Sequence, residues 1–125
     1  MFDKFLKAVA RLRLPKNQFA IFGSGPLSIR NLREANDIDL IVKEELWNEL
    51  SKKYSVMGTK LIKIGEAEIY KDWKPWFDDV NILIDSADII NNYRFVKLEY
   101  LLKWKKAMNR EKDKTDIKII NNFLT

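Results

Sequence analysis

The sequence predicts an α+β domain in which a small mixed β-sheet is flanked by helices. The chain is long enough for one hydrophobic core but not for two, so residues 1–125 are expected to form a single domain. Segments with helical spacing of apolar residues alternate with short apolar runs that are typical of buried strands. The resulting order, α-β-α-β-α-β-β-α-ββ-α-α, predicts helices packed on a mixed sheet, and no repeat or linker interrupts it.

The N-terminal half of the chain predicts three helices and two strands. The strands are the apolar runs QFAIF and DIDLIV, and Gly23 ends the first of them. Pro15 ends the first helix, and Pro26 fits the first turn of the second, where no amide hydrogen is needed. The expected elements are a helix over residues 2–13, a strand over 18–22, a helix from 26 to about 31, a strand over 37–42 and a helix over 44–54.

The C-terminal half predicts a hairpin, two further short strands and three helices. Gly65 marks the turn of the hairpin, and Asn91-Asn92 tolerates the left-handed backbone that a tight turn between strands requires. The expected elements are strands over residues 60–64 and 66–71, a helix over 79–87, two strands within 88–96, and helices over 98–108 and about 113–124.

The composition excludes several classes of site. The chain has no cysteine and no histidine, which rules out disulfides, thiolate or imidazole metal sites, and His-dependent catalytic triads. The apolar runs are too short to span a membrane, so a cytoplasmic protein is expected. The net charge is +5, and residues 93–114 alone hold eight Lys or Arg against three Asp or Glu. This distribution favours a polyanionic partner.

Two carboxylates interrupt the second strand. Alternation along a strand places Asp37 and Asp39 on one face, where their like charges repel unless a cation lies between them. Oxygen ligands suit a hard divalent ion such as Mg²⁺ or Mn²⁺. The alternative is structural: Asp37 caps the strand and Asp39 faces solvent.

A Gly-Ser-Gly turn precedes this strand and opens the helix at Pro26. Glycines let backbone N–H groups approach an anion closely, and the Ser24 hydroxyl adds a donor. Taken alone, the stretch indicates no more than a tight strand-to-helix turn. Combined with Asp37 and Asp39, it predicts a phosphate-binding turn beside a metal site. Nucleotidyl transfer requires both.

The two features together resemble a known family. Gly23-Ser24, twelve intervening residues and Asp37-Ile38-Asp39 resemble the Gly-Ser…Asp-h-Asp-h signature (h, apolar) of the DNA polymerase β-like nucleotidyltransferase superfamily. The tail is similar to that of small nucleotidyltransferases related to AbiEii-type abortive-infection toxins, with Lys97-Leu98 followed by Lys112-Asp113-x-x-Asp116-Ile117. The resemblance covers about residues 18–124.

This resemblance implies a polymerase β palm-like nucleotidyltransferase fold and a metal-dependent enzyme. Such an enzyme transfers a nucleoside monophosphate from an NTP to a hydroxyl of RNA, protein or a small molecule and releases pyrophosphate. In the family's two-metal scheme, Asp37 and Asp39 would be catalytic ligands of Mg²⁺ or Mn²⁺. Gly23 and Ser24 would hold the nucleotide's triphosphate.

The resemblance also implies a third carboxylate on a neighbouring strand. Glu68 is the candidate for this catalytic and metal-binding role, although the family more often has Asp there. Glu66 shares its expected face and Asp72 lies at the end of the strand. A plain exposed strand face explains the two glutamates about as well.

Three more residues are expected at the nucleotide. Arg33 precedes the loop to Asp37, and Lys112 and Asp116 match the tail motif. The structural alternatives are a solvated Arg33 and an i,i+4 ion pair between Lys112 and Asp116.

Two other functions stay open. The chain could be a nucleotide- or RNA-binding module that kept the fold without catalysis, or one component of a toxin–antitoxin pair. RNA, such as a tRNA end, or a protein would serve as acceptor. The small size of the domain favours a homodimer or a partner chain that completes the acceptor site.

Overall fold

The computed structural model describes every residue of the chain except 1, 36, 74, 75 and 78. The helices are α1 (Phe2–Arg11), α2 (Gly25–Ser28), α3 (Glu44–Lys53), α4 (Val80–Asp85), α5 (Leu98–Met108) and α6 (Lys114–Leu124), with the 3₁₀ turn η1 (Glu111–Asp113) before α6. The strands are β1 (Phe19–Phe22), β2 (Ile38–Val42), β3 (Leu61–Ile64), β4 (Ala67–Tyr70), β5 (Asp88–Ile90) and β6 (Tyr93–Phe95). These elements follow the predicted order.

The strands form one mixed sheet with the order β3-β4-β2-β1-β6-β5. The three hairpin-like neighbours, β1–β2, β3–β4 and β5–β6, pair antiparallel. The two long-range neighbours, β2–β4 and β1–β6, pair parallel. The mixed sheet and its flanking helices confirm the α+β class that the sequence predicts.

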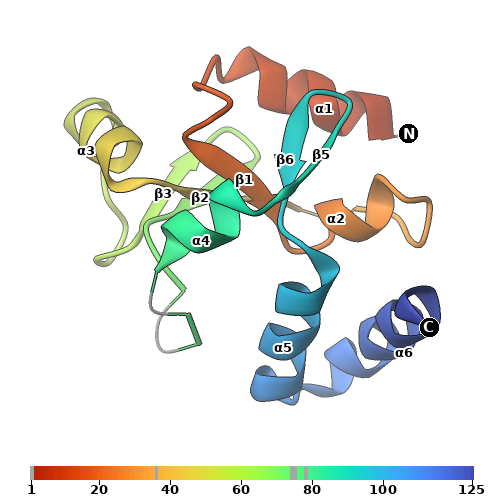
Figure 1. Cartoon of the computed structure of the whole chain (residues 1–125). Coiled ribbons are helices and arrows are strands. Elements are labelled where there is room, and N and C mark those ends of the chain that lie inside the picture. The colour runs from red at the N-terminus through yellow and green to blue at the C-terminus, as the bar shows by residue number, and fades with distance from the viewer. Residues whose placement is uncertain (1, 36, 74–75, 78) are drawn as a thin grey trace.

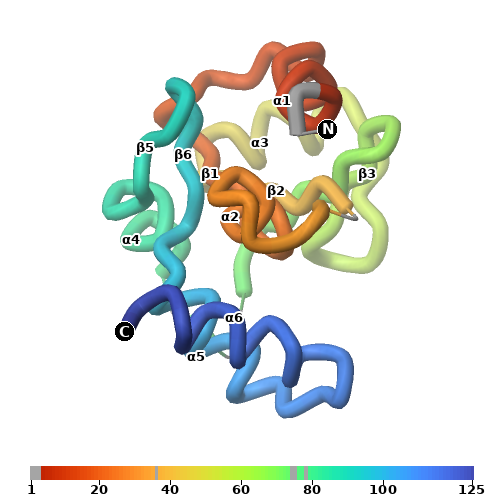
Figure 2. The backbone as a smooth tube through the Cα atoms, turned by 90° about the vertical axis from the view of Figure 1, so that its right-hand side faces the viewer, coloured from red at the N-terminus to blue at the C-terminus, as the bar shows by residue number. Residues whose placement is uncertain are grey.

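The sheet separates two hydrophobic cores. One face carries Ile21, Leu40 and Ile69, which pack with α1 and α3. The other face carries Ala20, Phe22 and Ile41, which pack with residues of α4, α5 and α6. Figure 2 shows α1 on one side of the strands and the α5–α6 pair on the other. Strand alternation therefore directs every second residue of β1, β2 and β4 toward the C-terminal helices.

Polar residues and glycines set the ends of several elements. Asp79 caps α4 by accepting a hydrogen bond from the backbone N–H of Asn81, at 2.9 Å. Asn109 ends α5 in the left-handed conformation, with φ at 50°. The Asn91-Asn92 turn between β5 and β6 is left-handed at both residues, as predicted for that pair.

The helix expected from residue 26 to about 31 is shorter in the structure. Helix α2 covers only Gly25–Ser28, and Asn31 takes a positive φ of 59°, which ends any helical continuation. Likewise α1 ends at Arg11, before the left-handed Arg13 and Pro15. Within the part of the chain that the structure describes, no helix has the length and apolar character needed to cross a membrane.

Gly25 is required by packing. Its neighbour across the turn is Ile21, and a β-carbon on Gly25 would overlap the Ile21 Cγ2 atom and lie 3.3 Å from Phe5 Cζ. We expect Gly25→Ala to lower the free energy of unfolding by about 1–3 kcal/mol, since overpacking displaces a buried side chain. Urea denaturation measures this.

Gly65→Asn is the matched control for that substitution. Gly65 has open space around its α-carbon and a positive φ that asparagine tolerates, so its variant should stay within about 0.5 kcal/mol of the parent. Equal losses for the two variants would contradict the packing role of Gly25.

Candidate functional site

The eight residues that the sequence nominates line one pocket. This pocket has a volume of about 440 Å³ and lies between the sheet and the C-terminal segment from α5 to α6. The eight residues are Gly23, Ser24, Arg33, Asp37, Asp39, Glu68, Lys112 and Asp116. They come from five separate stretches of the chain, so only the fold brings them together.

The parallel register of β2 and β4 brings two carboxylates side by side. Asp39 is the direct partner of Glu68 in this pair, and on its other side Asp39 is opposite Phe22 of β1. Asp37 lies just before β2, two residues from Asp39, and is exposed. All three carboxylates line the pocket, Asp39 and Glu68 from adjacent strands and Asp37 from the residue before β2. Of the expected juxtaposition, the structure shows the part between Glu68 and Asp39.

Burial and like charges perturb the ionisation of this carboxylate group. Burial of Asp39 raises its pKa to about 6, with further contributions from the charges of Glu68 and Asp37 and an opposing one from Lys105. The Tyr70 hydroxyl donates to Glu68 Oε1 at 3.2 Å. Burial, then the charges of Asp39 and Glu68, also raise the pKa of Tyr70. The carboxylate group thus carries negative charge that the protein compensates only in part.

Gly23 shapes the turn next to these carboxylates. Its φ is +69°, and a β-carbon there would overlap the Asp39 carboxylate. Glycine is therefore required twice, for the backbone conformation and for the space that Asp39 occupies. Ser24 follows at the N-terminal end of α2, where its carbonyl oxygen accepts from the amides of Leu27 and Ser28.

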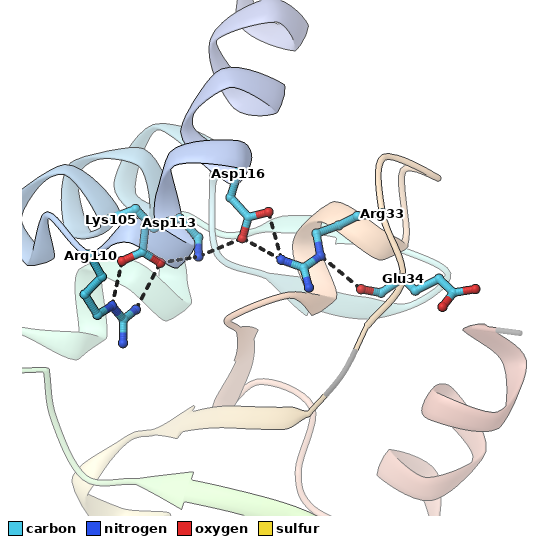
Figure 3. Close-up of polar contacts among 6 residues, drawn as sticks. All are labelled: Arg33, Glu34, Lys105, Arg110, Asp113 and Asp116. Carbon is cyan, nitrogen blue, oxygen red and sulfur yellow. Dashed lines mark hydrogen bonds and ion pairs between the residues drawn. The ribbon is translucent and has the colours of Figure 1, made fainter.

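Arg33 and Asp116 belong to a chain of ion pairs that forms the opposite wall (Figure 3). We call the series Arg33–Asp116–Lys105–Asp113–Arg110 the ionic chain. Arg33 Nη1 donates to both carboxylate oxygens of Asp116, at 2.8 and 2.7 Å. Lys105 Nζ lies 3.0 Å from Asp116 Oδ2 and 3.3 Å from Asp113 Oδ1.

Arg110 completes the ionic chain at its other end. Its Nε and Nη2 donate to the two oxygens of Asp113 at 2.6 and 3.1 Å, and its guanidinium lies 5.1 Å from the centre of the Trp104 ring. Burial alone would raise the pKa of Asp113, but the hydrogen bonds from Arg110 and the charge of Lys105 outweigh it, so this pKa is lowered. The ionic chain holds three cations and two anions and faces the carboxylates with a net positive charge.

The structure therefore decides between the alternatives for the tail residues. Asp116 pairs with Arg33 and Lys105, and Lys112 is exposed where it lines the pocket, so an i,i+4 pair of Lys112 with Asp116 is not what holds this segment. Arg33 is an ion-pair partner, which corrects the solvated alternative. The sequence did not indicate that Lys105 is buried between two aspartates.

Aromatic residues close the remaining side of the pocket. Trp73 stacks on Phe22 with ring centroids 4.6 Å apart and lies 4.6 Å from Tyr70. Trp104 contacts both Trp73 and Trp76. Trp73, Trp76 and Trp104 thus pack against the sheet and also line the pocket.

The donor set fits a hard divalent cation in its chemistry. Within the described residues, no group of three or more acidic side chains is already gathered closely enough to bind a metal ion. However, Asp37, Asp39 and Glu68 offer oxygen donors only. Burial, and then the charges of Glu68 and Asp37, raise the pKa of Asp39, and a bound cation would stabilise its ionised form.

Comparison of the chain with models of protein families, with curated proteins and with solved structures found no match.

Removing the charge of Asp39 should stabilise the metal-free protein. Because the folded-state pKa of about 6 exceeds the ordinary value of 3.8, ionised Asp39 disfavours the fold above pH 6, and this penalty disappears below pH 3.8. In EDTA, we expect Asp39→Asn to melt several degrees above the parent at neutral pH. Differential scanning calorimetry should show this difference shrinking as the pH falls through 6 toward 4.

The exposed Glu66 provides the control for Asp39. Glu66→Gln changes the net charge equally and should leave the melting temperature nearly unchanged. A melting temperature of Asp39→Asn at or below that of the parent at pH 7 would contradict the repulsion among the three carboxylates.

Lys105 should be the most sensitive cation for stability. Its side chain is 7% exposed, and Lys105→Met would leave Asp113 and Asp116, which are 2% and 4% exposed, with one partner fewer each. We expect a loss of about 3 kcal/mol in the free energy of unfolding, measured by urea denaturation.

Lys114→Met is the matched control, since Lys114 pairs with Glu111 on the surface and both side chains are well exposed. Its loss should be below about 0.5 kcal/mol. If both methionine variants unfold alike, the ionic chain does not stabilise the C-terminal helices.

Proposed function

We propose that this protein is a metal-dependent nucleotidyltransferase with a polymerase β palm-like fold. The observation that carries the proposal is the parallel register that sets Glu68 beside Asp39, across one pocket from Lys105 and Arg33. An acidic floor binds divalent cations, and a basic wall attracts phosphates. A nucleoside triphosphate complexed with Mg²⁺ needs both in one pocket.

The three carboxylates would bind the divalent ions. Asp37, Asp39 and Glu68 would hold Mg²⁺ or Mn²⁺, and the bound ions would neutralise charge on the triphosphate and on the departing pyrophosphate. Tyr70 keeps Glu68 oriented through its hydroxyl hydrogen bond.

The turn at Gly23 and the basic residues would hold the triphosphate. Gly23 lets the backbone pass close to Asp39, and the Ser24 hydroxyl and amide are donors for a phosphate oxygen. Lys112, exposed where it lines the pocket, would bind the outer phosphates, while Arg33 and Lys105 would act through the field of the ionic chain.

The proposed reaction is a single displacement at the α-phosphorus. The oxygen of an acceptor hydroxyl forms a bond to the α-phosphorus, and the bond from that phosphorus to the bridging β-phosphate oxygen breaks. Pyrophosphate leaves with the electron pair of the broken bond. The proton of the acceptor hydroxyl passes to the Glu68 carboxylate and then to solvent.

The decisive experiment combines binding with transfer. Isothermal titration with Mg²⁺ and each NTP should give metal-dependent binding to the parent. Asp37→Asn combined with Asp39→Asn should abolish that binding, because both ligands lose their charge. Glu45→Gln with Glu49→Gln, which changes two exposed carboxylates of α3, is the charge-matched control and should bind normally.

Transfer distinguishes the enzyme from a binding module. Incubation with α-phosphate-labelled NTPs and total RNA should place label on RNA or on the protein itself, and Glu68→Gln should reduce the rate while leaving nucleotide bound. Metal-dependent binding without transfer to any acceptor would support a non-catalytic nucleotide-binding module instead. Unchanged binding by the double asparagine variant would overturn the metal site.

A further inference from the structure

Positive charge is segregated in the first quarter of the chain. Residues 4–33 contain seven Lys or Arg residues and no Asp or Glu. Arg30 and Arg33 are used internally, in ion pairs with Asp88 and Asp116. The other five lie in α1 or just after it and are all exposed; we call them the α1 cations: Lys4, Lys7, Arg11, Arg13 and Lys16.

The helical part of this set forms one stripe. Lys4, Lys7 and Arg11 are spaced i, i+3 and i+7, so they share a face of α1. The opposite face carries Phe5 and Val9, which are 9% and 2% exposed in the core. The apolar face of α1 is buried in the protein. Helix α1 therefore exposes its charged face and offers no apolar face for insertion into a membrane.

The α1 cations have no carboxylate partner among the residues that the structure describes. Among the residues that the structure describes, none of the five takes part in an ion pair, and Lys16 lies over the Tyr93 ring at 4.5 Å. In the basic segment 93–114, by contrast, four cations are paired with carboxylates: Lys97, Lys105, Arg110 and Lys114. Unpaired positive charge therefore lies on α1 as well as in the tail, where the exposed Lys103, Lys106 and Lys112 take part in no ion pair among the described residues.

Helix α1 and the candidate site lie on opposite faces of the sheet and come together only at its edge, beside α2. The Phe5 ring of α1 reaches Gly25, and the adjacent residues Ser24 and Gly23 line the pocket. In Figure 1 the N-terminal end of α1 lies on the same side of the molecule as α2. A polyanion lying along the exposed face of α1 would therefore have to pass around α2 to reach the pocket.

We propose that the α1 cations bind the phosphate backbone of an RNA. The inference rests on the proposed function in one respect, namely that this RNA is the acceptor of the transferred nucleotide. Lysine and arginine side chains in a row contact backbone phosphates, and such contacts do not discriminate between base sequences. RNA fits the proposed chemistry because it carries 2′-hydroxyls along the strand as well as terminal ones. The expected binding is sequence-tolerant and strongly salt-dependent.

Salt dependence tests the surface directly. The variant Lys4→Gln with Lys7→Gln and Arg11→Gln removes the stripe and keeps good helix formers. Fluorescence anisotropy with a labelled single-stranded RNA, in EDTA and without NTP, should show weaker binding than the parent. The slope of log K against log salt should shrink in magnitude by about 0.7 per lost phosphate contact, or about 2 in all.

The control has the same net charge as the α1 variant. Lys52→Gln with Lys53→Gln and Lys118→Gln changes three exposed lysines of α3 and α6 and should bind RNA as the parent does. Circular dichroism should show that both triple variants melt like the parent, which keeps loss of binding separate from loss of fold.

Three outcomes would overturn the proposal. They are an unchanged salt slope in the α1 variant, equal losses in both triple variants, and tighter binding to anionic phosphatidylserine vesicles or to DNA of the same length than to RNA. The Asp37→Asn, Asp39→Asn protein should still bind RNA in EDTA. A failure of nucleotidyl transfer is therefore distinguishable from a failure of RNA binding.

Discussion

The parallel pairing of β2 with β4 is the constraint on which the site depends. It sets Asp39 directly beside Glu68, in the middle of the sheet, where the other residues of β1 and β2 are buried apolar side chains. Two adjacent acidic side chains in a partly buried place are costly, and the raised pKa of Asp39 records that cost. The glycine at position 23 and the positive wall around Lys105 are the features of the fold that accommodate this pair.

The ionic chain explains how the C-terminal helices are held against the sheet. Hydrophobic contacts of Leu101 and Ile120 supply most of the attraction, since burial of apolar area is non-directional and large. The ion pairs are directional, since each buried aspartate has two cationic partners. They therefore favour one position of the α5–η1–α6 segment against the sheet. Removing one partner of such a buried pair is strongly destabilising, because it leaves the other charge buried and unpaired.

Much of the fold and part of the site follow from local patterns. Period-two alternation correctly places Asp39 and Ile41 on one face of the sheet and Leu40 and Val42 on the other. Turn residues such as Gly65 and Asn91 mark the hairpins. Periodicity carries no information on which distant strand is the neighbour, so the β2–β4 register had to come from the structure. Lys105 has the spacing of an ordinary basic surface residue, and its burial results from two aspartates that reach it only after α6 folds back.

The separation of Arg33 and Asp116 along the chain has a consequence for how the molecule folds. Their ion pair closes a loop of 83 residues, whereas the α5–α6 hairpin and the β3–β4 hairpin close short ones. Closing a long loop costs more conformational entropy than closing a short one, and the stabilising contact forms only after that cost has been met. We expect the sheet and the two hairpins to form first and the pocket wall to close onto them last, so that the carboxylates meet their balancing charge only at the end of folding.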